Sequence, residues 1–352
     1  MGSAEETVSK EKDMSAVAFG SVFTSNMLRA TFEGSAWSGF SIVPMQNFDL
    51  HPASLVLHYS QTIFEGMKAY QQEDGSVALF RPSCNVARLA RSAKRMAIPP
   101  FDESSFLAAL IDFVRGEAAQ VPFRPGALYL RPTIFASEPM IAVRASTRFE
   151  FFVIAAPVGS YFSPAGGAQT GVEIFVSEQV ARAAPGGIGA VKAGANYGAT
   201  LKPIADAQAL GSSQVLFLDS GGKRLIEEAG GMNVFVVKGR QLMTPPLSDT
   251  ILSGVTRDSL LLLGSVLDLE VKEQALGIDA LVSDIDAGVV SEVFLSGTAA
   301  VIVSVSRLRF EDGSVVAVSR TGETPIANLL RDRLMNIQFG SAEDPFGWLV
   351  RI

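Results

Sequence analysis

The sequence has few of the residues that bind metals or form cross-links. Its 352 residues include one cysteine, Cys84, and two histidines, His51 and His58. A single cysteine excludes an intrachain disulfide and a thiolate metal cluster, and two histidines argue against a histidine-based metal site. A Ser–His–Asp triad would have to use one of the two imidazoles, and His58, within LVLHYSQTIF, is predicted to be a packed core histidine. We therefore expect no metal.

Long apolar runs and excess positive charge are also missing. The longest apolar run, LLLLGSVL (260–267), is too short to span a bilayer. A net charge of −7 is the opposite of the basic character typical of nucleic-acid-binding proteins. The start, MGSAEETVSKEKD, has neither the apolar segment of a signal peptide nor an Arg-rich amphipathic pattern. These features predict a cytoplasmic protein without nucleic-acid or membrane partners, whose residues 1–15 form a disordered leader.

The remaining composition is that of a globular protein. Hydrophobic residues make up 48% of the chain and charged residues 18%, and the length suits two domains. A Gly/Pro/Ser-rich stretch, GSYFSPAGGAQTG (159–171), predicts an interdomain loop. We therefore expect an N-terminal α/β domain at 1–158 and a C-terminal domain at 172–352.

Hydrophobic periodicity predicts both helices and strands, so the expected fold class is α+β or mixed α/β. The segment 83–96 is predicted to be a helix with Val86, Leu89, Ala93 and Met96 on one face and Arg88, Arg91 and Arg95 on the opposite face. Further helices are predicted at 102–118, 195–210, 253–267 and between Thr324 and Gly340. Buried strands are predicted at 76–80, 127–135, 148–158, 172–177, 213–219, 232–239 and 291–305.

Two segments place charged side chains in unusual surroundings. Lys192 is the one lysine of GGIGAVKAGANYGAT (186–200), where its neighbours are mostly glycine and alanine. It is either a solvated charge in a surface loop or an amine held in a pocket as a nucleophile. Glu227 and Glu228 stand directly before a glycine-rich turn and a buried strand. They are either solvated turn residues or buried carboxylates that need a cationic or N–H partner.

Two other segments are candidates for anion binding. In ILSGVTRDSLLLLGSVL, the backbone N–H groups near Val255 and Thr256 start a helix and can bind a phosphate. The alternative is ordinary capping of that helix by Ser253. In FLSGTAAVIV, Thr298 can bind an anion with its hydroxyl and N–H, or the segment is a bulge between two strands.

The order of these features is more specific than any one of them. An arginine on a helix, a lysine among small residues, a glutamate before Gly-Gly-Met-Asn, a Gly-Val-Thr helix start and a Ser-Gly-Thr-Ala turn are the parts of a pyridoxal 5′-phosphate (PLP) site. From about Phe19 to about Phe346 the chain resembles the branched-chain-amino-acid aminotransferases, two-domain PLP enzymes of fold type IV. The matching segments are FGSVFTSNM, LHYSQTIFEGMKAY, LFRPSCNVARLARSAKRM, LYLRP, GAVKAGANYGAT, EEAGGMN, LSGVTRDSLL and FLSGTAA.

The resemblance implies a role for each matching residue. Lys192 corresponds to the Schiff-base lysine, Tyr197 to the tyrosine at the cofactor's phenolic oxygen, and Glu228 to the partner of the pyridine nitrogen. The implied phosphate-binding residues are Arg88, Val255, Thr256 and Thr298. The implied substrate pocket consists of Phe23, Tyr59, Phe64, Tyr129, Arg131, Tyr161 and, through a backbone contact, Ala299.

The resemblance also implies the reaction and the assembly. A homodimer would transfer the amino group of leucine, isoleucine or valine to 2-oxoglutarate, with the loop SEPMIAVRA (137–145) reaching the other subunit's site. We expect Arg131 and Tyr59 to serve the side-chain carboxylate of glutamate far more than leucine, because an apolar pocket cannot bury that charge without donors. TAAVIVS lacks the Cys-x-x-Cys pair of mammalian members, so that kind of redox switching is excluded.

Two alternatives stay open at this point. One lies within the same fold type: a D-amino-acid aminotransferase or an aminodeoxychorismate lyase, which match around the lysine and the glutamate but lack the full LHYSQTIFEGMKAY…LFRP block. The other is a relative that binds PLP without catalysis. The joint presence of Lys192, Glu228, Arg88 and Tyr197 favours an enzyme.

Overall fold

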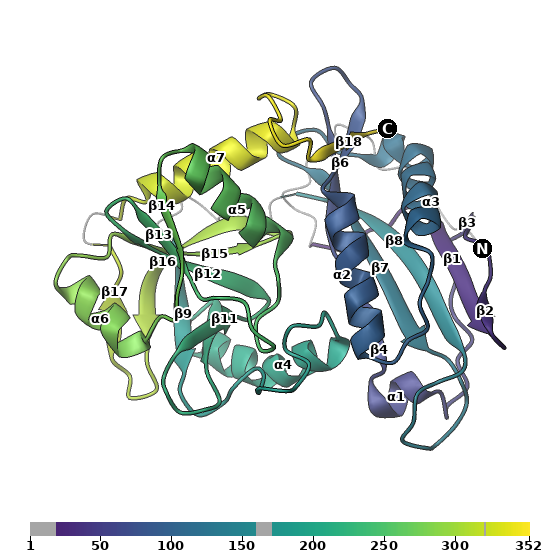
Figure 1. Ribbon diagram of the computed structural model, residues 1–352, viewed down its shortest axis with the longest axis horizontal. Coiled ribbons are helices and arrows are strands. Elements are labelled where there is room, and N and C mark those ends of the chain that lie inside the picture. The colour runs from purple at the N-terminus through teal and green to yellow at the C-terminus, as the bar shows by residue number, and fades with distance from the viewer. Residues whose placement is uncertain (1–18, 160–170, 320–321) are drawn as a thin grey trace. The chain divides into compact units, whose positions relative to one another are not determined.

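The chain forms two compact units, which we describe separately. The computed structural model describes residues 19–159, 171–319 and 322–352. Unit 1 comprises residues 1–163 and 336–352, and unit 2 comprises 164–335 (Figure 1). None of the helices in the described ranges combines the length and the apolar character needed to cross a membrane.

Unit 1 is built on a nine-stranded antiparallel sheet. Its main order is β18-β6-β5-β7-β8-β1-β2, with β3 on β1 and β4 on β7. The strands are β1 (Asn26–Glu33), β2 (Ala36–Trp37), β3 (Ser41–Pro44), β4 (Thr62–Phe64), β5 (Met67–Gln71), β6 (Val77–Phe80), β7 (Ala127–Ala136), β8 (Phe149–Val158) and β18 (Leu349–Arg351). The helices are α1 (Leu55–Tyr59), α2 (Pro82–Arg95), α3 (Glu103–Gly116) and a short 3₁₀ turn, η2 (Ala118–Gln120).

Helices α2 and α3 pack on this sheet through aromatic and aliphatic side chains (Figure 1). Phe106 of α3 is fully buried, and its ring lies 4.6 Å from that of Phe151 on β8. Asp102 caps α3 by accepting a hydrogen bond from the Ser105 N–H at 2.5 Å, which satisfies one of the free donors at the helix start. The helix therefore begins where the acidic residues predicted it to begin.

Unit 2 contains a closed ring of strands. Its sheet has the order β11-β10-β9-β16-β15-β12-β13-β14, and an additional β11–β12 pairing joins β12 back to the start. Six strands thus form a barrel, and β13, β14 and β17 extend it. The strands are β9 (Val172–Ser177), β10 (Gln214–Leu218), β11 (Ile226–Ala229), β12 (Met232–Lys238), β13 (Gln241–Thr244), β14 (Glu270–Glu273), β15 (Glu292–Gly297), β16 (Val301–Arg309) and β17 (Val315–Ala317).

Four helices accompany this barrel: α4 (Gly194–Ala209), α5 (Val255–Val266), α6 (Ile278–Asp286) and α7 (Pro325–Gln338) (Figure 1). Helix α7 begins at Pro325, as predicted, and Glu292 of β15 accepts hydrogen bonds from the N–H groups of Ile326 and Ala327 at 2.9 and 2.8 Å. A carboxylate at this position stabilises the positive end of the helix.

The predicted second domain differs from unit 2 at its C-terminal end. Residues 336–352 belong with unit 1. The reason is a pairing between strands far apart in sequence: β18 adds to β6, and the Trp348 ring lies 5.5 Å from that of Phe80. The two units divide between residues 163 and 164. The loop predicted at 159–171 lies, apart from its two end residues, outside the described residues.

Three local predictions are corrected by the structure. The single strand predicted at 291–305 is a hairpin of β15 and β16. His58 is exposed instead of packed in the core, and its Nε2 lies 2.9 Å from the Pro52 carbonyl oxygen. Arg88, placed with Arg91 and Arg95 on the polar face of its helix, is only 4% exposed. Its burial is explained by the carboxylate of Glu65, in the connection between β4 and β5, described below.

Candidate active site

Lys192 lies in the connection between β9 and α4, one residue before the helix N-cap, Ala193. Asn196 in the first helical turn is buried, and its Nδ2 donates to the carbonyl oxygens of Ile188 and Val191 at 2.7 Å each. These bonds fold the chain back and hold the lysine in place. The partly buried Lys192 Nζ donates to the Tyr197 hydroxyl at 3.0 Å, so the interpretation as a freely solvated surface charge does not hold.

A second segment, residues 248–250, holds the lysine loop from another side. The Ala190 N–H donates to the Asp249 carbonyl oxygen at 2.9 Å. At Gly189 the backbones approach so closely that a Cβ would lie 2.6 Å from the Thr250 Cα. Only glycine fits at such a distance, which gives one glycine of the GGIGAVKAGANYGAT stretch a packing reason.

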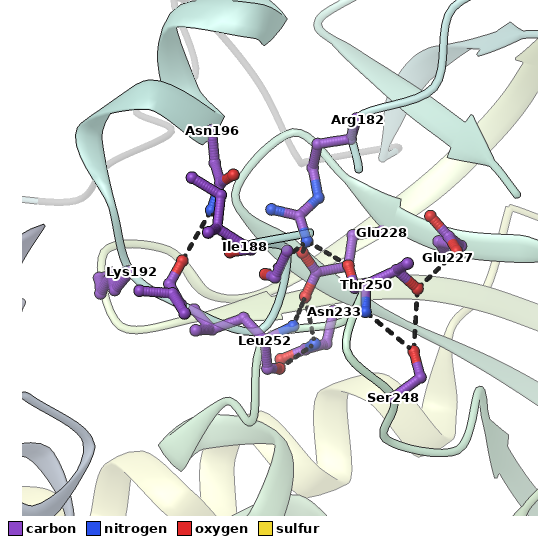
Figure 2. A network of polar contacts seen from close by, with 12 residues as sticks. Arg182, Ile188, Lys192, Asn196, Glu227, Glu228, Asn233, Ser248, Thr250 and Leu252 are labelled. Atoms are coloured by element: carbon purple, nitrogen blue, oxygen red, sulfur yellow. Dashed lines mark hydrogen bonds and ion pairs between the residues drawn. The ribbon is translucent and has the colours of Figure 1, made fainter. Parts of the chain in front are cut away.

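Glu228 stands at the end of β11, opposite Asn233 of β12. Its Oε1 accepts hydrogen bonds from Asn233 Nδ2 and from the Leu252 N–H, each at 2.9 Å. Its Oε2 lies 2.6 Å from Nη2 of Arg182 in an ion pair whose side chains are 4% and 3% exposed. Figure 2 shows the guanidinium of Arg182 against this carboxylate, with Asn233 and Leu252 beside it.

Burial dominates the electrostatics of Glu228. Removal from water raises the pKa of this carboxyl to about 7, because the charged form loses its hydration. Arg182 is the strongest opposing influence, followed by the Leu252 N–H and the charge of Lys192, whereas Glu227 raises the pKa further. The ionised form at neutral pH therefore depends on nearby cations and donors.

Glu227 is also buried, at 7% exposure, so the interpretation of the pair as solvated turn residues is wrong. Its Oε1 accepts a hydrogen bond from Thr250 Oγ1 at 2.6 Å, and that hydroxyl lies 2.9 Å from Ser248 Oγ. Burial raises the pKa of the Glu227 carboxyl as well. The two glutamates have separate partners: Glu228 contacts Arg182, Asn233 and Leu252, and Glu227 contacts Thr250.

Tyr197 connects the lysine with the turn beside Glu228. Gly231 lies between β11 and β12, and a Cβ there would lie 3.1 Å from the Tyr197 Cε1. The phenol ring therefore lies against the backbone of this turn, which a larger residue would displace. The amine and the phenol, from the start of α4, are thus brought together with the carboxylate of Glu228 on β11.

The start of α5 provides backbone N–H donors in unit 2. Gly254, not Ser253, is the N-cap of this helix. A side chain does not fit at this position, because a Cβ on residue 254 would lie 2.1 Å from Asn233 Oδ1. The first N–H groups of a helix have no intrahelical partner, which makes Val255 and Thr256 suitable anion ligands. The neighbouring Arg257 is engaged elsewhere, with the Pro245 carbonyl oxygen at 2.8 Å and Glu273.

Thr298 and Ala299 lie in the loop of the β15–β16 hairpin, which closes with Gly297 paired to Val301. Val301 has φ +63°, a left-handed conformation that often ends such three-residue loops. The segment is therefore a hairpin loop and not a bulge. Both residues are half-exposed, which leaves their side chains and backbone accessible.

In unit 1, Phe64, Tyr129 and Arg131 form one cluster. Arg131 Nη2 donates to the Tyr129 hydroxyl at 2.9 Å, and its Cζ lies 4.6 Å from the Phe64 ring centroid. Its Nε is buried and has no hydrogen-bond acceptor within the described parts of the chain. Lys68, paired in register with Tyr129, is a buried cation whose pKa is lowered to about 8 by burial.

The other predicted pocket residues do not join this cluster. Phe23 and Tyr59 are 48% and 39% exposed, and no hydrogen bond or ring contact links them to it within the described ranges. Tyr161 lies outside the described residues. Arg88 is held by Glu65 through a two-pronged ion pair, with Nε at 2.6 Å from Oε1 and Nη2 at 2.8 Å from Oε2.

Sequence reasoning missed Arg182, Asn196, Asn233 and Lys68. All four are buried polar side chains, and burial of a polar residue was not visible in patterns read over short windows. The one available signal was their position next to predicted site segments. Among the described residues, no group of three or more histidine, cysteine, aspartate or glutamate side chains is arranged to hold a metal ion.

Comparison with known proteins agrees with this arrangement. Residues 62–308 match the family model "Amino-transferase class IV". The branched-chain-amino-acid aminotransferase of Mycobacterium tuberculosis is 42% identical over 342 residues, which cover 95% of this chain and 92% of the relative. The Bacillus subtilis branched-chain-amino-acid transaminase 1 is 40% identical over 349 residues, which cover 97% of this chain and 96% of the relative.

A crystal structure of the Escherichia coli branched-chain amino acid aminotransferase has a TM-score of 0.74 at 30% identity and covers 88% of this chain and 96% of its own. Its fold and that of this chain therefore agree over nearly the full length. The chain belongs to the class IV aminotransferases of fold type IV, and within them to the branched-chain-amino-acid aminotransferases.

Proposed function

We propose that this enzyme moves the amino group of leucine, isoleucine or valine to 2-oxoglutarate, using PLP bound to Lys192. The observation that carries the proposal is the arrangement of Lys192, Tyr197 and the buried Glu228 in one unit. The names of the relatives support the substrate class. Another branched-chain amino acid aminotransferase of similar structure (TM-score 0.74, 25% identity, 91% of this chain and 97% of its own) has been solved with pyridoxamine 5′-phosphate, which supports the cofactor.

The residues present fit PLP in their chemistry. The cofactor has an aldehyde, a phenolic oxygen, a ring nitrogen and a phosphate, and each has a complementary group in unit 2. These groups are the Lys192 amine, the Tyr197 hydroxyl, the Glu228 carboxylate and the N-terminus of α5. In addition, a carboxylate oxygen has two acceptor positions, and the contact of Glu228 Oε2 with Arg182 uses one of them, which leaves room for a further hydrogen bond. This oxygen can therefore accept one from a protonated ring nitrogen.

When bound, PLP supplies an electron-accepting ring conjugated to the substrate nitrogen. Lys192 would hold the cofactor covalently, and its amine, when free, would take the proton from the substrate Cα. Tyr197, held 3.0 Å from Lys192 Nζ, orients that amine and donates to the phenolic oxygen. Glu228 keeps a proton on the ring nitrogen. Each role uses a group that the fold already holds in position.

We assign phosphate binding to the N–H groups of Val255 and Thr256, to Thr298 and to Arg88. The first two follow from the free donors at the start of α5. Arg88 lies in unit 1 and already binds Glu65 along its Nε and Nη2 edge. A phosphate would therefore have to meet another edge of this guanidinium, or share it with Glu65.

We assign substrate recognition to Phe23, Tyr59, Phe64, Tyr129, Arg131, Tyr161 and the backbone of Ala299. Within this set, Arg131 is suited to a carboxylate, because its buried Nε lacks an acceptor in the described part of the chain. The Tyr129 phenol next to it combines an apolar ring with a polar tip. Arg131 is thus the residue proposed to distinguish glutamate from leucine.

We propose that the active form is a homodimer. The loop 137–145 is stabilised within unit 1 by the Glu138–Arg144 ion pair and by the Met140 N–H, which donates to Ala53 at 2.9 Å. It leaves Ile141 and Val143 exposed at 73% and 88%, whereas Met140 is half-buried. Exposed apolar residues on an ordered loop support a subunit contact. The cytoplasmic location stays a prediction.

Two experiments test the proposal. Borohydride reduction of the protein after incubation with PLP, followed by peptide mass mapping, should place the label on Lys192 alone. A panel of L- and D-amino donors with 2-oxoglutarate should show turnover with leucine, isoleucine and valine. Labelling of another lysine would contradict the cofactor assignment, and preference for D-amino acids would contradict the substrate assignment.

A further inference from the structure

Arg182 is a buried arginine that the proposed reaction does not yet use. It lies after β9 in the connection that leads to Lys192, and its side chain is 4% exposed. Its Nη2 donates to the carbonyl oxygens of Gly189 and Thr250 at 3.0 and 2.5 Å. The same nitrogen lies 2.6 Å from Glu228 Oε2. One guanidinium thus connects the lysine loop, the segment 248–250 and the carboxylate.

We infer that Arg182 is a positioning residue that holds Glu228 ionised and in one orientation, so that this carboxylate can keep the cofactor ring nitrogen protonated. The second half of the inference rests on the proposed function; the first half concerns the protein alone. Arg182 acts through Glu228 and is not assigned a contact with substrate or cofactor.

The hydrogen-bond geometry supports a role in orientation. The two carbonyl acceptors fix the guanidinium from the side of the backbone, and Gly189 can serve as one of them only because it has no Cβ to collide with Thr250. On the other side of the carboxylate, Asn233 and the Leu252 N–H hold Oε1. Oε1 and Oε2 are therefore held by different partners, and rotation of the carboxylate would break contacts on both sides.

The charges around Glu228 support a role in ionisation. The titratable groups acting on it are Arg182, Lys192 and Glu227, and Arg182 is the stronger of the two that favour the anion. When the Lys192 amine is bound to the cofactor, its effect on the ionisation of Glu228 changes. The guanidinium of Arg182, in contrast, stays charged throughout. An arginine is thus the one permanent cation next to Glu228 in this part of the described structure.

The first test measures the pKa of Glu228 in the protein without PLP. Protein labelled with [δ-¹³C]glutamate is titrated by ¹³C NMR, and the Glu228 signal is identified by its loss in Glu228→Gln. In Arg182→Met the Glu228 pKa should rise by about one unit or more, a tenfold or greater change in proton affinity. Arg182→Lys, which keeps the charge but not the guanidinium whose Nη2 reaches both carbonyls, should raise it less.

A matched control is Arg257→Met. Arg257 is as buried as Arg182 but pairs with Glu273 instead of Glu228. Its loss should leave the Glu228 titration unchanged. An unchanged Glu228 pKa in Arg182→Met, or an equal rise in Arg257→Met, would overturn the inference. If Arg182→Met does not fold, as judged by near-UV circular dichroism, Arg182→Lys decides: no rise in the pKa contradicts the proposal.

The second test uses the holoenzyme with [¹⁵N]PLP. The ring nitrogen shift should report a protonated nitrogen in the wild type and loss of that proton, at the same pH, in Arg182→Met. A ring nitrogen equally protonated in both proteins would overturn the link between Arg182 and the cofactor. If PLP is not bound at Lys192 at all, the proposed function fails, while the titration without PLP still decides whether Arg182 controls Glu228.

Discussion

The amine nitrogen of Lys192 and the hydroxyl oxygen of Tyr197 lie 3.0 Å apart, although the two residues are separated by the start of helix α4. The contact arises because Asn196 anchors the preceding loop to the first turn of this helix. It gives the lysine a defined direction before any ligand is present. Predictions about the reaction begin with this pair.

Lys192→Ala should remove the covalent attachment of PLP and reduce turnover by roughly 10²–10⁴-fold or more, the usual range for loss of a general base. The measurement is transamination of leucine together with mass analysis after borohydride reduction. Lys202→Ala is the matched control, because Lys202 lies on α4, the helix that follows Lys192, with its side chain 82% exposed. A wild-type rate in Lys192→Ala without added amine would refute the assignment.

Glu228→Gln should reduce transition-state stabilisation by several kcal/mol, because it weakens the hold on the ring proton. It should also destabilise the fold by about 3–5 kcal/mol, because it leaves Arg182 buried without its charge partner. Glu227→Gln should cost much less, since Glu227 contacts Thr250 instead. The comparison of kcat/KM for both variants checks this. If Glu227→Gln is the more damaging change, the roles of the two glutamates are exchanged.

Arg131→Met should weaken glutamate and 2-oxoglutarate by about 1.5–3 kcal/mol, the scale of a hydrogen bond to a charged group. Leucine should change much less, because it presents no side-chain charge to Arg131. The two half-reactions, measured separately by stopped-flow absorbance, give this contrast. Equal losses with both substrates would mean that Arg131 supports the fold or the cofactor.

Lys68 should make stability depend on pH. Burial lowers its pKa from 10.5 to about 8, so between these values the unfolded chain binds a proton that the folded protein does not. Unfolding free energy should therefore rise with pH, by about 1.5 kcal/mol between about pH 8 and 9.5, and this rise should be absent in Lys68→Met. Urea unfolding at several pH values measures it, with Lys202→Met as the control; equal slopes in wild type and Lys68→Met would contradict the assignment.

The exposed pair Ile141 and Val143 should matter for assembly. Replacing both with glutamate should shift the protein from dimer to monomer in sedimentation velocity and lower activity, because charge opposes burial of this loop. Val266→Glu, at another exposed apolar position, should leave the sedimentation unchanged. A fully active wild-type monomer would refute the proposed dimer.

The sequence by itself determined most of the secondary structure, and it pointed to the residues for which chemical roles are proposed. The helices α2, α3, α4, α5 and α7 and the strands β6 to β10 and β12 agree with the prediction within a few residues. Local patterns suffice for these elements because helices such as α3 have one buried face and strands such as β6 and β12 are continuous apolar runs buried on both faces. The motifs around Lys192, Glu228 and Val255 also depend on neighbours in sequence, so they are legible in the chain alone.

Only the tertiary structure decided which charges are buried together. Arg88 follows the spacing of exposed arginines, yet it is buried because Glu65, in the connection between β4 and β5, pairs with it. The strand predicted at 291–305 is interrupted because Thr298 to Ala300 form the loop of a hairpin. The C-terminal residues join unit 1 because β18 pairs with β6, a contact without any local signal.

Arg182 shows the same limit within the site itself. Nothing in its neighbourhood in sequence distinguishes it from a surface arginine, and Glu228 lies far along the chain. The two meet because the β11–β12 pairing closes the barrel and brings the end of β11 next to the connection that follows β9. Burial in water-free surroundings then makes their charges interdependent. Long-range strand pairing, which local sequence patterns do not contain, thus determines the environment of the carboxylate.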